Sequence, residues 1–122
     1  MTRAASRQRG VLALWTAVLL PIVIMLLALV IESAYLFALR RAQQTATDLA
    51  AQAGALQALR ENAAGVTTAA QYTAAENGFP VAASTTVTVD RPPATGAYAG
   101  NELAVRVRIE HQPPRLFSAL FV

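Results

Sequence analysis

The sequence predicts an α+β protein: a long N-terminal transmembrane helix that continues outside the membrane, a short second helix, a small two-stranded antiparallel sheet and an apolar C-terminal tail. Three observations predict this architecture. Residues 11–31 form one unbroken apolar run, residues 33–62 hold strong helix formers and no proline, and two later segments alternate between apolar and polar residues. The length outside the run supports at most one small domain with a thin core.

The apolar run at residues 11–31 has the length of a membrane span. Its residues, at about 1.5 Å each, give roughly 31 Å of helix, which matches a hydrocarbon core of about 30 Å. Trp15 near one end, and Tyr35 and Phe37 past the other, are typical of interfacial aromatic residues. A cleaved signal peptide is the alternative, but its apolar core is usually only about 7 to 15 residues long. No small-x-small cleavage site follows the run, so the sequence favours an uncleaved anchor.

Basic residues on both sides of the run predict its orientation. Arg3, Arg7 and Arg9 precede it, whereas Arg40 and Arg41 follow it. The more basic end is expected in the cytoplasm, which leaves the C-terminal part outside. We therefore expect four segments: a cytoplasmic basic segment at residues 1–10, a transmembrane helix at 11–31, an extramembrane continuation of the helix at 32–62, and a small αββ domain with an apolar tail at 63–122.

A heptad pattern marks the outer half of the expected helix. Apolar residues follow one another at spacings of three and four, and this helix-packing seam consists of Leu39, Ala42, Ala46, Leu49, Ala53 and Leu56. The small members of the seam allow close approach of another helix. The alternative is that the seam covers the core of the protein's own small domain.

Glu32 is an acidic residue at the exit of the membrane, on the same helical face as Leu39 and Ala42. If the helix sits deep, this carboxylate lies near lipid and needs a basic partner. If the helix sits higher, Glu32 is the first hydrated residue, and the sequence favours this second placement because nothing forces the helix inward.

The small domain is expected to hold one helix and two strands. The helix at residues 67–76 is followed by Asn77-Gly78, which stops it. The strands are expected at 84–90 and 102–110, joined by a flexible loop; the second would direct Leu103, Val105, Val107 and Ile109 to one face. If the tail is helical, it gathers Leu116, Phe117, Leu120 and Phe121 on one side, where they could dock on the domain, the bilayer or a neighbour.

The chain offers little material for catalysis, so no enzyme activity, cofactor or metal is expected. There is no cysteine, the seven acidic residues are scattered, and no glycine-rich phosphate loop is present. His111, the single histidine, is expected to face solvent at a strand end. All ten basic residues are arginines, and their distribution fits membrane topology, so nucleic acid is not expected as a partner.

Five segments together resemble the bacterial tight-adherence (Tad, or Flp) pilus assembly proteins, in particular the TadG-like and TadE-like membrane proteins. They are the arginine-glycine opening with its following Ala-x-x-x-Pro at residues 9–21, the acidic exit with Ala-x-Asp-x-Ala-Ala at 32–51, the Asn-Gly turn at 77–78, the Val-x-Val strand at 105–107, and the Phe-x-x-Leu-Phe end at 117–121. Their order and spacing span nearly the whole chain.

This resemblance implies a non-enzymatic component of a Tad/Flp-type (type IVb-like) pilus assembly or secretion apparatus. It implies a bacterial inner-membrane protein with a periplasmic domain, whose partners are membrane lipid and other apparatus proteins, in a homo- or hetero-oligomer formed through the long helix. Cleaved family members have a glutamate five residues after the processing glycine, where this chain has Trp15. The resemblance is therefore closer to the uncleaved TadG-like group, and Gly10 is only a doubtful processing site.

Longer TadG-like proteins also carry a metal-binding Asp-x-Ser-x-Ser motif, which this chain lacks, so no metal-dependent adhesion is implied. A function of another class is a small bitopic regulator or sensor. Such a protein would act on a partner membrane protein through the same alanine and leucine seam.

Overall fold

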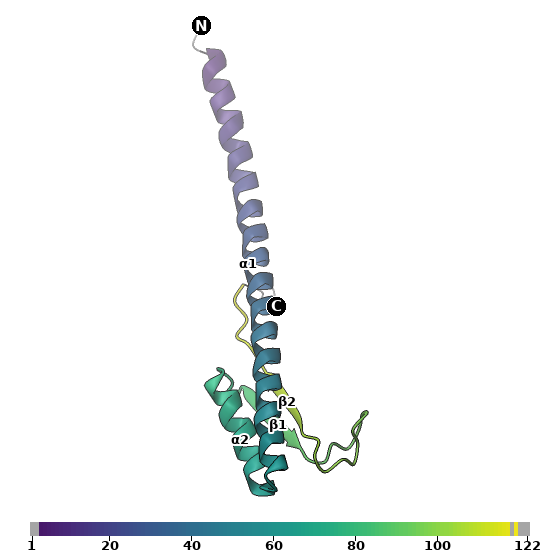
Figure 1. Cartoon of the computed structure of the whole chain (residues 1–122). Helices are drawn as coiled ribbons and strands as arrows, with labels where there is room; N and C mark the ends of the chain where they lie inside the picture. Colours follow the sequence, from purple (N-terminus) through teal and green to yellow (C-terminus); the bar gives the residue numbers. More distant parts are fainter. Residues whose placement is uncertain (1–2, 118, 120–122) are drawn as a thin grey trace. The chain divides into compact units, whose positions relative to one another are not determined.

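A computed structural model describes residues 3–117 and 119, and in this part of the chain two helices precede two strands (Figure 1). The elements in order are α1 (Arg3–Leu59), α2 (Ala63–Glu76), β1 (Thr85–Asp90) and β2 (Arg106–His111). The α+β fold class is therefore confirmed. The chain divides into two compact units, Met1–Phe37 with Arg115–Val122 and Ala38–Pro114, and α1 contributes residues to both.

In the first unit, the apolar run is open to its surroundings. The large apolar side chains from Val11 to Ile31 are between 48% and 68% exposed, although α1 has a mean hydropathy of 2.8 over its most apolar window. Pro21 lies inside α1, which continues on both sides of it. A core helix of a globular protein would bury such residues, so their exposure fits a helix whose solvent is lipid.

The second unit begins with the outer part of α1 and the turn into α2. Asn62 caps α2, because its side-chain oxygen accepts a hydrogen bond from the backbone N–H of Gly65 at 3.1 Å. The helix therefore begins at Ala63, four residues before the position expected from sequence. Gly78, at φ +91°, follows the end of α2 at Glu76 and stops the helix as expected.

We expect Asn62→Ala to destabilise the second unit by about 1 kcal/mol, because it removes the acceptor at the start of α2. Denaturant titration of the full chain in detergent micelles, followed by circular dichroism, measures this loss. Asn62→Asp is the matched control, since it keeps the acceptor and should stay near the wild-type midpoint. Equal midpoints for the alanine and aspartate variants would show that the cap contributes nothing.

The sheet pairs β1 with β2 in antiparallel register, with Val87 opposite Ile109. The strand expected at residues 102–110 was placed too early: Leu103 precedes β2 and is 57% exposed, so it does not share the buried face. Local contacts explain the difference. The loop before β2 is held by hydrogen bonds from the Arg106 guanidinium to Thr95 and from the Gly100 N–H to the Pro93 carbonyl at 3.0 Å.

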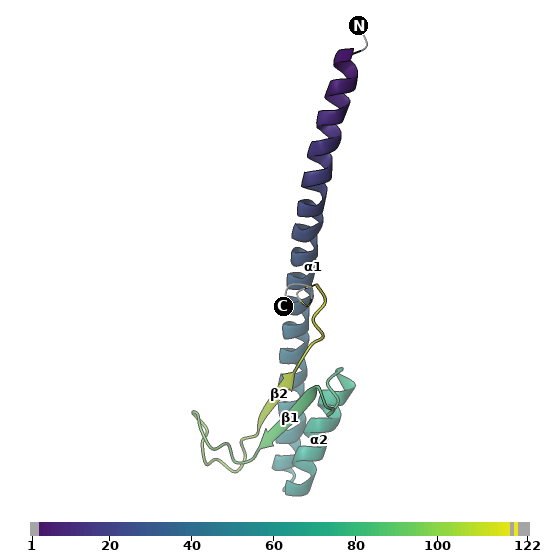
Figure 2. The same cartoon turned by 180° about the vertical axis from the view of Figure 1, so that it is seen from behind.

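The core of the second unit lies where the two strands pack on the two helices (Figure 2). The helices contribute only alanines to this cluster and the strands contribute larger residues; its buried members are Ala46, Ala50, Ala70, Ala74, Phe79, Val87, Val107 and Ile109. Alanine buries little area, so the side chains of the strands and of Phe79 supply most of the apolar contact.

His111 belongs to the edge of this core, which corrects the expectation of a solvent-facing histidine. Its ring is half-buried, its Nδ1 lies 2.8 Å from the hydroxyl of Thr85, and it meets the ring of Phe79 edge-on at 5.6 Å. The histidine therefore has a packing role. In the tail, Leu116 and Phe117 are 46% and 38% exposed, whereas Leu120 and Phe121 lie outside the described residues.

Candidate helix-packing surface

The outer part of α1 has a buried side formed by small residues at intervals of four. Ala46, Ala50, Gly54 and Ala58 are all buried. A Cβ atom added at Gly54 would lie 3.1 Å from Cγ1 of Val105 and 3.5 Å from Cγ1 of Val66. This side of α1 is therefore occupied by the protein's own α2 and the segment before β2, and close approach depends on the missing side chain at Gly54.

Another side of the same helix segment is exposed and apolar. Ala42, Leu49 and Leu56 follow one another at intervals of seven, and we call these three residues the exposed stripe. Leu49 is 38% exposed and Leu56 is 55% exposed. Residues seven apart lie on nearly the same face of a helix, so the stripe is a continuous surface that a second helix can cover.

The six residues of the sequence-predicted seam are thus divided between these two sides. Ala46 is part of the core, Leu39 packs against it and Ala53 is half-buried, whereas the three residues of the exposed stripe remain accessible. The alternation of three and four residues missed Ala50, Gly54 and Ala58. The repeat of alanine or glycine at every fourth residue from Ala46 is the sequence signal that could have found them.

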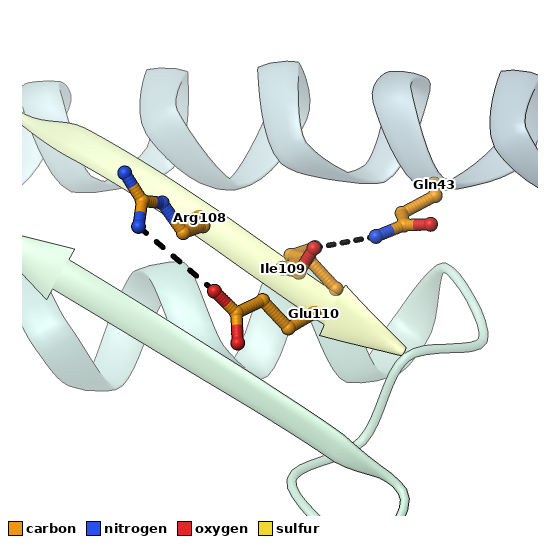
Figure 3. A network of polar contacts seen from close by, with 4 residues as sticks. All are labelled: Gln43, Arg108, Ile109 and Glu110. Carbon is orange, nitrogen blue, oxygen red and sulfur yellow. Dashed lines mark hydrogen bonds and ion pairs between the residues drawn. The ribbon is translucent and has the colours of Figure 1, made fainter. Parts of the chain in front are cut away.

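One polar contact joins β2 to α1, and a second lies within β2 (Figure 3). The side-chain amide of Gln43 donates a hydrogen bond to the backbone carbonyl of Ile109. On the outer face of the sheet, Arg108 and Glu110 form an ion pair at 3.9 Å, with both side chains about two-thirds exposed. An ion pair this exposed contributes little to stability, so Gln43 provides the more important of the two contacts.

A shallow groove lies between α1 and the loop before β2. Its lining includes Thr47, Asp48 and Ala51 from the helix, Tyr98 from the loop and Val107 from β2. Tyr98 is 70% exposed beside it. Among the described residues, no group of three or more acidic, histidine or cysteine side chains could hold a metal. The groove therefore offers apolar and hydroxyl contacts together with the charged side chains of Asp48 and Arg106.

The two other residues singled out from the sequence lie in the first unit. Glu32 is buried, with 8% of its surface exposed, which differs from the expectation of a hydrated residue at the end of the run. Gly10 is exposed within α1, with nothing within 4 Å of the position that a Cβ atom would take. Neither residue is part of the exposed stripe or the groove.

Comparison with known proteins gives a match to a protein family. Residues 10–58 match the model of the Tad family, described as "Putative Flp pilus-assembly TadE/G-like". No curated protein and no solved structure matches the chain. The matched segment contains the apolar run, Glu32, the exposed stripe and the buried alanines of α1 up to Ala58. Over this segment, the chain is similar to the TadE/G-like family of putative Flp pilus-assembly proteins.

Proposed function

We propose that this protein is a non-enzymatic, membrane-anchored component of a bacterial Tad/Flp-type pilus assembly or secretion apparatus, acting through helix packing with pilin-like or assembly partners. The observation that carries the proposal is that the segment shared with the family, residues 10–58, holds both the exposed apolar run and the exposed stripe. One helix thus supplies a membrane anchor and a surface for another helix.

In this proposal the two halves of α1 have different tasks. Residues 11–31 span the inner membrane, residues 1–10 lie in the cytoplasm, and the αββ domain lies in the periplasm, as the arginine distribution favours. The domain covers the buried side of α1, from Ala46 to Ala58, and leaves the exposed stripe for the partner. The family likeness to uncleaved members supports retention of residues 1–10, with Gly10 the position to examine for processing.

The proposal is tested by photo-crosslinking from the exposed stripe in the native membrane. A photoreactive amino acid at Leu56 is expected to crosslink to pilin-like or assembly proteins, identified by mass spectrometry. Tyr72 on α2, which is 67% exposed, is the matched control position and should yield at least tenfold fewer of these products. Crosslinks only to membrane proteins unrelated to the apparatus would contradict the proposal and favour the regulator.

Substitution of the exposed stripe gives a second readout. We expect Leu49→Gln with Leu56→Gln to reduce partner recovery on co-purification about tenfold or more, because burying each leucine is worth about 1.5 to 3 kcal/mol. Both residues lie outside the core, so the denaturation midpoint should stay close to wild type. Unchanged recovery in the double variant would exclude the exposed stripe as the contact surface.

A further inference from the structure

Two neighbouring arginines of α1 have no protein partner among the described residues. Arg40 and Arg41 are exposed, and neither guanidinium makes a hydrogen bond or ion pair in that part of the chain. Three arginines of the second unit are committed elsewhere: Arg91 to the Glu102 carbonyl at 2.7 Å, Arg106 to Thr95, and Arg108 to Glu110, whereas Arg60 at the far end of α1 is exposed like the pair. The pair at 40–41 therefore keeps its full donor capacity for a ligand.

Residue counting along α1 places these guanidinium groups at a defined level. The side chain of a helical residue covers the turn N-terminal to its own Cα, which here is the turn near residues 36–37. That level lies five or six residues beyond Ile31, or roughly 8 Å at about 1.5 Å per residue. The headgroup layer of a bilayer is about 5 to 7 Å thick on each side of the hydrocarbon core. The guanidinium groups thus lie at about the outer edge of that layer, within reach of the lipid phosphates.

Exposed aromatic residues support the same placement. Tyr35 is 39% exposed and Phe37 is 65% exposed, and both precede the arginine pair by about one turn. Aromatic rings concentrate at the boundary between hydrocarbon and headgroups, so a layer of aromatic residues followed by cations matches the order of layers in a bilayer. Arginine is suited to this position, since its planar group donates two parallel hydrogen bonds to one phosphate.

We propose that Arg40 and Arg41 form a binding site for the phosphate groups of phospholipids on the outer face of the membrane, and that this site fixes the depth of α1. The inference rests on the membrane anchoring in the proposed function. Because adjacent residues are about 100° apart around a helix, the two arginines engage separate lipids. The contact sets the end of the apolar run at the hydrocarbon boundary.

The experiment measures proximity between arginine carbon and lipid phosphorus by solid-state NMR. Full-length protein with ¹³C-labelled arginine is reconstituted in vesicles of phosphatidylcholine and phosphatidylglycerol at three to one. Wild type is compared with Arg40→Gln/Arg41→Gln and with Arg60→Gln/Arg108→Gln, a control that removes the same charge from two other exposed positions. The signal of guanidinium carbons close to phosphorus should fall in the first variant and stay at the wild-type level in the control.

Two further samples separate lipid phosphate from free phosphate. Vesicles of digalactosyldiacylglycerol contain no phosphorus, and they are measured without and with added inorganic phosphate. We expect no carbon–phosphorus signal from Arg40 and Arg41 in either sample. An equal loss in both variants, no loss in the first variant, or a contact that depends on free phosphate would overturn it. Carbonate extraction of the same vesicles tests the membrane anchor separately. Release of the wild-type protein would refute the membrane anchoring. If all variants are retained, a negative NMR result refutes only the proposed arginine site.

Discussion

Gly54→Leu is expected to destabilise the second unit by about 3 kcal/mol, at the upper end of the cost of overpacking a core. Even the first added carbon lies 3.1 Å from Val105, and Val66 closes the other side at 3.5 Å. A leucine has three more carbons to place between the helix and these two valines. Denaturant titration of the full chain in micelles, monitored by hydrogen exchange of the β1 and β2 amides, measures the loss.

Two variants show whether the effect arises from space at this position. Ala42→Leu introduces the same side chain on the exposed side of the same helix, so it should leave the midpoint nearly unchanged. Gly54→Ala should lie close to wild type, because a gain of about 1 kcal/mol in helix propensity opposes the tight contact with Val105. If Gly54→Leu were as stable as Ala42→Leu, the close approach of α1 to Val66 and Val105 would be wrong.

Phe79→Ala is expected to cost about 3 to 5 kcal/mol, the range for removing a buried aromatic ring. Phe79 is 3% exposed and is the largest buried side chain in a core whose helical part is alanine, so its neighbours cannot fill the space. The edge-on contact with His111 is lost as well. The same hydrogen-exchange measurement should show loss of protection in both strands, since β1 and β2 both pack on this cluster.

Tyr72→Ala is the control for Phe79→Ala, because it removes an aromatic ring that is 67% exposed on α2. Its effect should stay within about 0.5 kcal/mol. Phe79→Leu should fall between the two, since it keeps most of the apolar volume and loses the aromatic contact, worth about 0.5 to 1.5 kcal/mol. Full strand protection in Phe79→Ala would contradict the assignment of this residue to the core.

The elements that could be predicted from sequence are those with a strong local signal. The apolar run, the continuation of α1 through residues 33–59 and the antiparallel pair of strands each follow from periodicity or composition within a short window. The start of α2 and the start of β2 could not be placed this way. The first depends on the Asn62 cap and the second on contacts between Arg106 and Thr95, which compete with local propensity.

In the helix-packing surface too, the sequence predicts features with a local signal but not those set by contacts between distant residues. A heptad count identifies apolar positions on α1 but does not say which of them the protein uses for itself. That choice depends on where α2 and the strands pack, so Ala46 and Leu49, three residues apart in one seam, have different surroundings. For the same reason His111 could not be recognised as a packed residue, because its contacts with Thr85 and Phe79 come from distant parts of the chain.

The hydrogen bond from Gln43 to Ile109 limits how the protein can associate. Gln112 donates to Ser84 across the ladder at 2.9 Å, so in antiparallel alternation the backbone groups of Ile109 face away from β1, toward the outer edge of β2. An unprotected strand edge is a template for adding strands from other molecules. Here a side chain of α1 occupies the acceptor that an incoming strand would need. An incoming strand would have to displace Gln43 from this carbonyl, so the contact opposes growth of a sheet through β2 at Ile109.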